Sequence, residues 1–94
     1  MYVFSANATA HESFDEFNKG DVVPFIVYIN FKDLFGAEQL CQIYLLQQGF
    51  KKPVIEKRKL IEDKFLQDPK LIDADPALKE ALTSGYSIQV FSAH

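Results

Sequence analysis

The sequence contains few of the residues that build metal, redox and phosphate sites. Its 94 residues include one cysteine, two histidines and four glycines, and no tryptophan. A single cysteine cannot form an internal disulfide bond, so we expect a protein of a reducing compartment, the cytoplasm. The four glycines are scattered, and neither G-x-G-x-x-G nor a P-loop motif occurs. The sequence therefore predicts no loop that cradles a phosphate.

Long apolar segments are also absent. No apolar run approaches the roughly 20 residues that a membrane-spanning helix requires. The first ten residues lack the basic stretch and the long apolar region of a signal peptide. We therefore expect no membrane span and no secretion signal.

What the sequence does contain is the composition of one folded domain. Hydrophobic residues make up 48% of the chain and charged residues 24%, with a formal net charge of −3. These values are typical of a globular protein and not of a disordered tail. The length fits a single α+β domain over residues 1–94, without a second core. Nine Phe and four Tyr supply that core generously.

Runs of β-branched and aromatic residues predict four strands, and the helical spacing of apolar residues predicts three helices. The most hydrophobic segment includes Pro24, which cannot donate to a strand ladder. We expect the strand to begin at or just after this proline and to lie centrally, covered on both faces. Lysines and Pro53 predict that the third strand lies at an edge. The predicted strands are 2–7, 25–31, 53–61 and 86–93, and the predicted helices are 10–18, 34–48 and 76–84.

Capping residues indicate where the helices begin. Thr9–Glu12 match a capping box and predict the 10–18 helix. Asp33 is the expected N-cap of the 34–48 helix. Two near-copies, Asp68–Leu71 and Asp75–Leu78, each place a proline after a capping aspartate. We expect the first copy to start only a turn and the second to start a helix.

Four strands interleaved with helices predict a two-layer α+β sandwich: a mainly antiparallel four-stranded sheet with the helices packed on one face. The commonest fold of this kind is ferredoxin-like, with the order βαββαβ. The predicted elements contain an additional short helix and no clean hairpin. A variant of the ferredoxin-like arrangement is therefore the alternative.

No constellation of residues indicates catalysis, a metal ion or a cofactor. His11 and Asp15 could share one face of a helix, but zinc needs three or four ligands, and no second internal His or Cys completes the set. A Ser/His/Asp triad would need His11 or His94, and neither lies in a recognisable nucleophile turn. Cys41 lies on the apolar face of the 34–48 helix, which predicts a buried structural thiol. We therefore predict no catalytic, metal or cofactor-binding residues, and a protein that is not an enzyme.

Half of the ten cationic residues lie within positions 51–59, at the start of the predicted edge strand and just before it. A basic strand beside Phe50 could contact the phosphates of RNA and stack on its bases. The net negative charge and the single arginine weigh against nucleic acid, and a solvated edge strand is the simpler interpretation. The candidate basic patch consists of Lys51, Lys52, Lys57, Arg58 and Lys59.

The number of aromatic rings suggests a surface for another protein. A sheet with helices on one face leaves its other face bare, and monomers rarely expose large apolar patches. We therefore expect a non-enzymatic interaction or regulatory protein that forms a homodimer through this face, unless all the rings are internal. The alternatives are a nucleic-acid-binding module that uses residues 51–59, or a small-molecule-binding domain with a pocket between sheet and helices. The candidate interface residues are Phe25, Tyr28, Tyr86 and Phe91.

Overall fold

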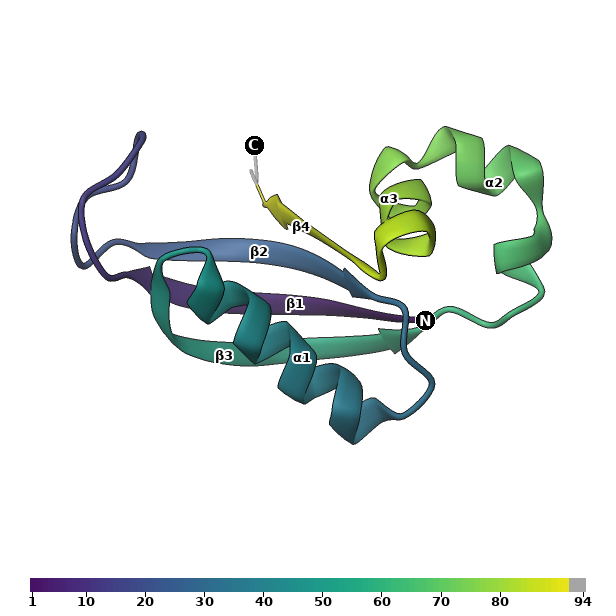
Figure 1. Cartoon of the computed structure of the whole chain (residues 1–94), viewed down its shortest axis with the longest axis horizontal. Helices are drawn as coiled ribbons and strands as arrows, with labels where there is room; N and C mark the ends of the chain where they lie inside the picture. The colour runs from purple at the N-terminus through teal and green to yellow at the C-terminus, as the bar shows by residue number, and fades with distance from the viewer. Residues whose placement is uncertain (92–94) are drawn as a thin grey trace.

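A computed structural model describes residues 1–91 and shows an antiparallel sheet combined with helices, an α+β fold (Figure 1). All four predicted strands and the helices predicted near 34–48 and 76–84 are present. The last two residues of the predicted 86–93 strand lie outside the described residues. The elements are β1 (Tyr2–Ala10), β2 (Val22–Ile29), α1 (Leu34–Gln47), β3 (Phe50–Leu60), the 3₁₀ turn η1 (Phe65–Gln67), α2 (Pro69–Ala74), α3 (Pro76–Ser84) and β4 (Tyr86–Val90).

The strands pair in the order β3-β1-β2-β4, and every neighbouring pair is antiparallel. As predicted, β2 lies inside the sheet and β3 lies at an edge. The first two strands follow one another directly and form a hairpin in which Tyr2 is opposite Ile29. A ferredoxin-like fold places a helix between its first two strands. The ferredoxin-like arrangement is therefore not confirmed for this chain, whose elements follow the order ββαβααβ.

The predicted 10–18 helix does not form. β1 continues through Thr9, which pairs with both neighbouring strands, and Ala10, which pairs with Phe50 of β3, so the threonine is not available as a helix cap. The following loop contains a β-bridge between Phe14 and Phe17. Their rings meet the ring of Phe50 edge-on, at centroid distances of 5.4 and 5.8 Å. Packing of the two rings on β3 replaces the helix, because a tertiary apolar contact outweighs the local capping pattern.

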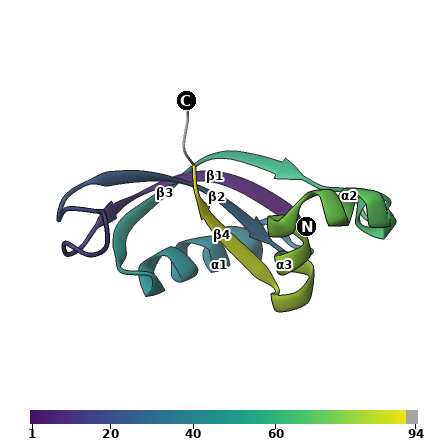
Figure 2. The ribbon, with the colours of Figure 1, turned by 90° about the horizontal axis from the view of Figure 1, so that it is seen from above.

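Helix α1 covers the inner face of the sheet (Figure 2). β1 presents small side chains there, and Ala6 and Ala8 are almost completely buried in one cluster with Cys41 of the helix. Small residues in alternate positions of a strand let a helix approach the sheet closely. At the β4 edge, Tyr44 stacks on Tyr86 with the ring centroids 3.9 Å apart. The predicted N-cap is also confirmed, since the Asp33 carboxylate accepts from Gly36 N–H at 2.7 Å.

Helix α3 packs on the opposite face of the sheet, so the expectation that all helices lie on one face is wrong. Tyr28 and Ser87 are paired across β2 and β4 and therefore point to the same face. There the Tyr28 hydroxyl donates to Asp75 at 2.9 Å, and the Ser87 hydroxyl donates to Glu80 at 3.3 Å. The neighbour of Ser87 along the strand, Tyr86, points to the other face and contacts α1. The sheet is thus covered on both faces at this end.

The sheet is covered on both faces at this end because β2 carries apolar side chains on both of its faces. Phe25 is buried on the inner face, whereas Ile26 and Tyr28 are half-buried on the outer face. The sequence predicts that β2 is covered on both faces along its length. This holds only near the C-terminal end of the strand, since Val22 at its start is 66% exposed. The strand also begins at Val22, two residues before Pro24, and not after the proline.

The chain between β3 and α3 is more helical than expected. The first Asp-Pro pair starts a six-residue helix, α2, and not a single turn. Asp68 caps it by accepting from Lys70 N–H at 3.0 Å. Met1, Leu78 and Ala81 form a second buried cluster beneath this helical end of the molecule. Figure 2 shows α2 and α3 grouped there beside the N-terminus.

We expect Gly85→Ala to destabilise the protein by about 1–2 kcal/mol, because a side chain strains the left-handed backbone. Gly85 ends α3 at φ 95°, and no atom would contact an added Cβ. The cost is therefore backbone strain alone. Urea unfolding at neutral pH measures it, with Ser84→Ala in the preceding helical position as the control. An equal effect of the two substitutions would contradict this account of the helix end.

Candidate functional site

Beyond the reach of α3, the outer face of the sheet carries no helix of the described chain. Its register brings together outward-pointing residues of three strands, with Ser5 between Ile26 and Lys57 at the centre. Val22, Pro24 and Val54 are exposed, and the outward residues of β1 are half-buried. We call this surface the open face; it consists of Val3, Ser5, Asn7, Thr9, Val22, Pro24, Ile26, Val54, Lys57 and Lys59.

The lysines of the predicted basic patch border the open face, but the arginine does not. Lys57 and Lys59 are opposite Ser5 and Val3, whereas Arg58 points to the inner side. There its Nε donates to Glu38 of α1 at 2.7 Å, and this hydrogen bond raises the pKa of Arg58. The patch is therefore divided between the two faces of the edge strand.

Near the start of β3, the lysines that border the open face lie beside a depression of about 330 Å³. Lys52, Val22 and Val54 contribute to its lining. Lys51 is opposite Thr9 and is half-buried. Glu56 also lines the depression, and its carboxylate accepts from the side-chain amide of Asn7. The border is thus mainly basic, with one acidic group held by a neighbour.

The four candidate interface residues do not share one surface. Phe25 is 3% exposed and meets the ring of Phe50 at a centroid distance of 4.8 Å, so it is a core residue and unavailable to a partner. Tyr86 faces α1, and Tyr28 lies under α3. Phe91 is 48% exposed beside β2, where its N–H donates to Pro24 O at 2.9 Å. Successive side chains of β2 point to opposite faces of the sheet, so Phe25 and Tyr28 lie on different faces.

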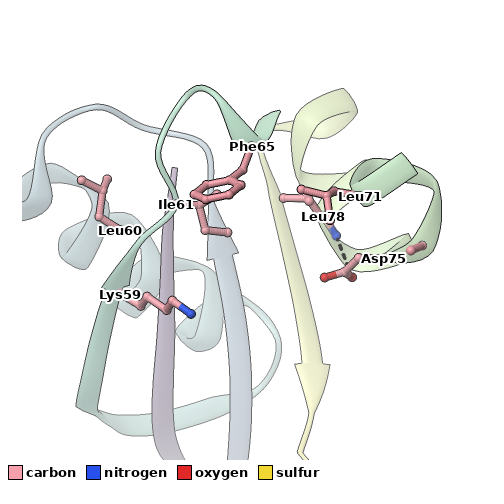
Figure 3. Close-up of a pocket in the computed structure, with 8 residues that line it drawn as sticks. Lys59, Leu60, Ile61, Phe65, Leu71, Asp75 and Leu78 are labelled. Atoms are coloured by element: carbon pink, nitrogen blue, oxygen red, sulfur yellow. Dashed lines mark hydrogen bonds between the residues drawn. The ribbon is translucent and has the colours of Figure 1, made fainter. Parts of the chain in front are cut away.

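A pocket of about 400 Å³ lies at the α3 end of the outer face (Figure 3). Of its lining, sequence analysis named only Lys59 as a candidate functional residue, because its walls come from segments whose arrangement only folding decides. The available signal was the pairs Phe65–Leu66 and Leu71–Ile72, which are apolar within a largely charged stretch. The pocket is lined by Lys59, Leu60, Ile61, Phe65, Leu71, Ala74, Asp75 and Leu78.

Asp75 is the most heavily hydrogen-bonded side chain at this pocket. One carboxylate oxygen accepts from Ala77 N–H and Leu78 N–H, at 3.1 and 3.2 Å, and so caps α3. The other oxygen accepts the Tyr28 hydroxyl. Burial, together with the hydrogen bond to Asp75 and its negative charge, raises the pKa of Tyr28 to about 12. This carboxylate therefore joins the sheet to the helix.

The residues weighed for catalysis and metal binding are dispersed. Cys41 is completely buried, and burial, followed by the charge of Glu38, raises the pKa of its thiol to about 12. His11 is exposed in the loop after β1, 4.0 Å from Glu12. His94 lies outside the described residues. Within residues 1–91, no three His, Cys, Asp or Glu side chains gather into a group able to hold a metal ion.

Comparisons of the chain with protein-family models, with curated proteins and with solved structures find no match. No functional residue can therefore be transferred from a relative. In the described part of the chain, no helix has both the length and the apolar character needed to cross a membrane. The open face and the pocket are the features from which function can be inferred.

We expect Tyr28→Phe to lower the free energy of unfolding by about 1–2 kcal/mol at neutral pH, because it removes a hydrogen bond to a carboxylate. The control is Tyr86→Phe, since the ring of Tyr86 makes its contact by stacking. Chemical denaturation measures both. A similar loss in the two variants would show that the Tyr28–Asp75 bond has no particular weight.

The stability of the wild type and of Tyr28→Phe can also be compared as a function of pH. The pKa of Tyr28 is raised from 10.0 to about 12, so the folded state holds the phenolic proton more tightly than the unfolded state. This stabilisation is complete below pH 10 and is lost as the pH rises through 12. We therefore expect the stability difference between the wild type and Tyr28→Phe to shrink over that interval. A constant difference would contradict the raised pKa.

Cys41 should react slowly with a thiol reagent in the folded protein, because the thiol is buried and its pKa is raised. Labelling by a disulfide reagent at pH 8, followed by absorbance, measures the rate. In denaturant the same thiol should react at the rate of a free cysteine. Equal rates in the two conditions would show that Cys41 is accessible and would return it to consideration as a nucleophile.

Proposed function

We propose that this chain is a non-enzymatic interaction domain that contacts a second copy of itself through the open face. The observation that carries the proposal is the composition of that face. The apolar residues Pro24 and Ile26 of β2 lie beside small polar residues of β1 such as Ser5, and charged groups such as Lys57 border the face on β3. Such a mixture of apolar and polar residues is the usual composition of a protein–protein contact.

The position of the face in the sheet also supports the proposal. α3 already covers the Tyr28 end, which shows that the outer side of β2 is suited to packing. Farther along the strand, Val22 remains 66% exposed and faces Thr9 on β1. A second copy placed on this part of the strand would bury apolar area that the chain itself leaves in water, and such burial favours association.

The size of the molecule is suited to a contact of this kind. A standard interface buries roughly 800 Å² on each partner. The described protein has an accessible surface of 6146 Å². One such interface would therefore occupy about an eighth of that surface. The residues of three strands in the open face form a continuous surface on which such a contact can be made.

Four lysines on one side of β3 favour a second candidate function, binding to single-stranded nucleic acid. Lys57 and Lys59 adjoin a row of small polar side chains that includes Ser5. Such a row could follow a phosphate backbone. Aromatic rings usually stack on the bases, and here Phe25 is buried and Tyr28 lies under α3, so of the candidate rings only Phe91 is exposed beside this face. Retention of single-stranded RNA that falls steeply with salt would favour this candidate over self-association.

We expect Ile26→Glu to weaken self-association strongly, because a carboxylate at the centre of the contact would be buried without a partner. Sedimentation velocity over a micromolar concentration series should show a dimer for the wild type and a monomer for the variant. Gln39→Glu adds the same charge to an exposed position of α1 and should leave the dimer unchanged. A wild-type protein that stays monomeric throughout the series would remove the proposal.

A further inference from the structure

Three large apolar side chains that remain in contact with water line one pocket. Leu60, Phe65 and Leu71 are 54%, 45% and 43% exposed, and all three line the pocket described above. Leu78, also in the lining, is buried. A volume of about 400 Å³ falls within the range of small-molecule sites, roughly 300–1,000 Å³. The pocket can therefore remove an apolar group of moderate size from water.

Four separate parts of the chain form its walls. They are the end of β3, the segment that follows it to Phe65, helix α2 and the beginning of α3 (Figure 3). The ammonium group of Lys64 lies 5.1 Å from the centroid of the Phe65 ring, an attraction that helps to hold the ring at the pocket. In Figure 3 the Phe65 ring is drawn over the side chain of Ile61, and Leu71 and Leu78 lie on the side of Asp75.

The two charged groups of the lining are not equivalent. The Asp75 carboxylate already accepts three hydrogen bonds, from Tyr28 and from the first turn of α3. Lys59 makes no ion pair with any residue in 1–91. In Figure 3 the Lys59 side chain extends across β1, at the margin of the group of apolar side chains. The pocket thus offers apolar walls and one positive charge whose partner is not supplied by the described chain.

We propose that this pocket binds a small amphipathic anion, a monocarboxylate with an unbranched hydrocarbon chain of medium length. Its carboxylate pairs with Lys59, and its hydrocarbon chain lies against Phe65, Leu71 and Leu78. The charge selects an anion over a cation, and the apolar lining selects a hydrocarbon body over a sugar or a nucleotide. The site adjoins the open face and shares Lys59 with it, whereas its apolar lining lies outside that face.

Calorimetric titration of the full chain with hexanoate, octanoate and decanoate, each below its micelle concentration, tests the apolar part. We expect one saturable site whose affinity rises about fourfold with each added methylene until the pocket is filled. Octanol should bind more weakly than octanoate, because it lacks the charge. Absence of saturable binding, or an affinity that does not change with chain length, would overturn the proposal.

Two substitutions locate the site. Lys59→Gln should lower the affinity for octanoate by about fivefold, the upper value for an exposed ion pair. Lys57→Gln, on the same face of the same strand, is the matched control and should bind as the wild type does. Ala74→Phe places a ring in the pocket from an exposed position and should abolish binding. Equal affinities of the two lysine variants, or wild-type binding by a folded Ala74→Phe, would place the ligand elsewhere and overturn the proposal.

Two further measurements distinguish a free carboxylate from an anionic lipid surface and separate this proposal from the proposed self-association. Sedimentation with anionic phosphatidylglycerol vesicles should leave the protein in solution, whereas binding to vesicles without binding to monomeric octanoate would overturn the proposal. Ile26→Glu should bind octanoate with the affinity of the wild type, because Ile26 does not line the pocket. Loss of self-association in that variant with binding retained distinguishes the open face from the pocket.

Discussion

Strand β2 carries apolar side chains on both of its faces, and the arrangement of the whole chain follows from the need to cover them. On the inner face Phe25 and Val27 are buried beneath α1. On the outer face Tyr28 requires separate cover, which only an element on the other side of the sheet can provide. The chain provides it by returning from β3 through α2 and α3. Because α3 is nine residues long, it covers one end of the sheet and leaves the open face uncovered.

The contact between α3 and the sheet depends on a polar group as well as on apolar packing. Asp75 caps the helix and accepts the hydroxyl of Tyr28, so the start of the helix is tied to one position on β2. A carboxylate satisfied by three donors can be partly buried at small cost, whereas an unpaired carboxylate cannot. The pocket lies at this end of the sheet, and it adjoins the open face at Lys59, which belongs to both.

Local sequence signals predicted the elements in which side-chain pattern and chain conformation agree. The 34–48 helix has a capping aspartate and an apolar stripe, and the 76–84 helix lies between Asp75 and a glycine with positive φ. The predicted 10–18 helix had a capping box as well, yet Phe14 and Phe17 contribute more by packing on Phe50 in an irregular loop. A short helix is only marginally stable by itself, so a distant contact can decide the conformation of such a segment.

The sequence by itself determined the number of strands, the interior position of β2, the edge position of β3 and the burial of Cys41. Each of these follows from composition and spacing within one segment, which is the information that a sequence carries directly. Tertiary structure decided which strands are neighbours, that α1 and α3 lie on opposite faces, and that Phe25 and Tyr28 are separated by the sheet. It also brought Lys59 beside Leu71 and Asp75, which are distant along the chain. These features depend on contacts between segments, and the free energy of such contacts is not contained in the pattern of either segment alone.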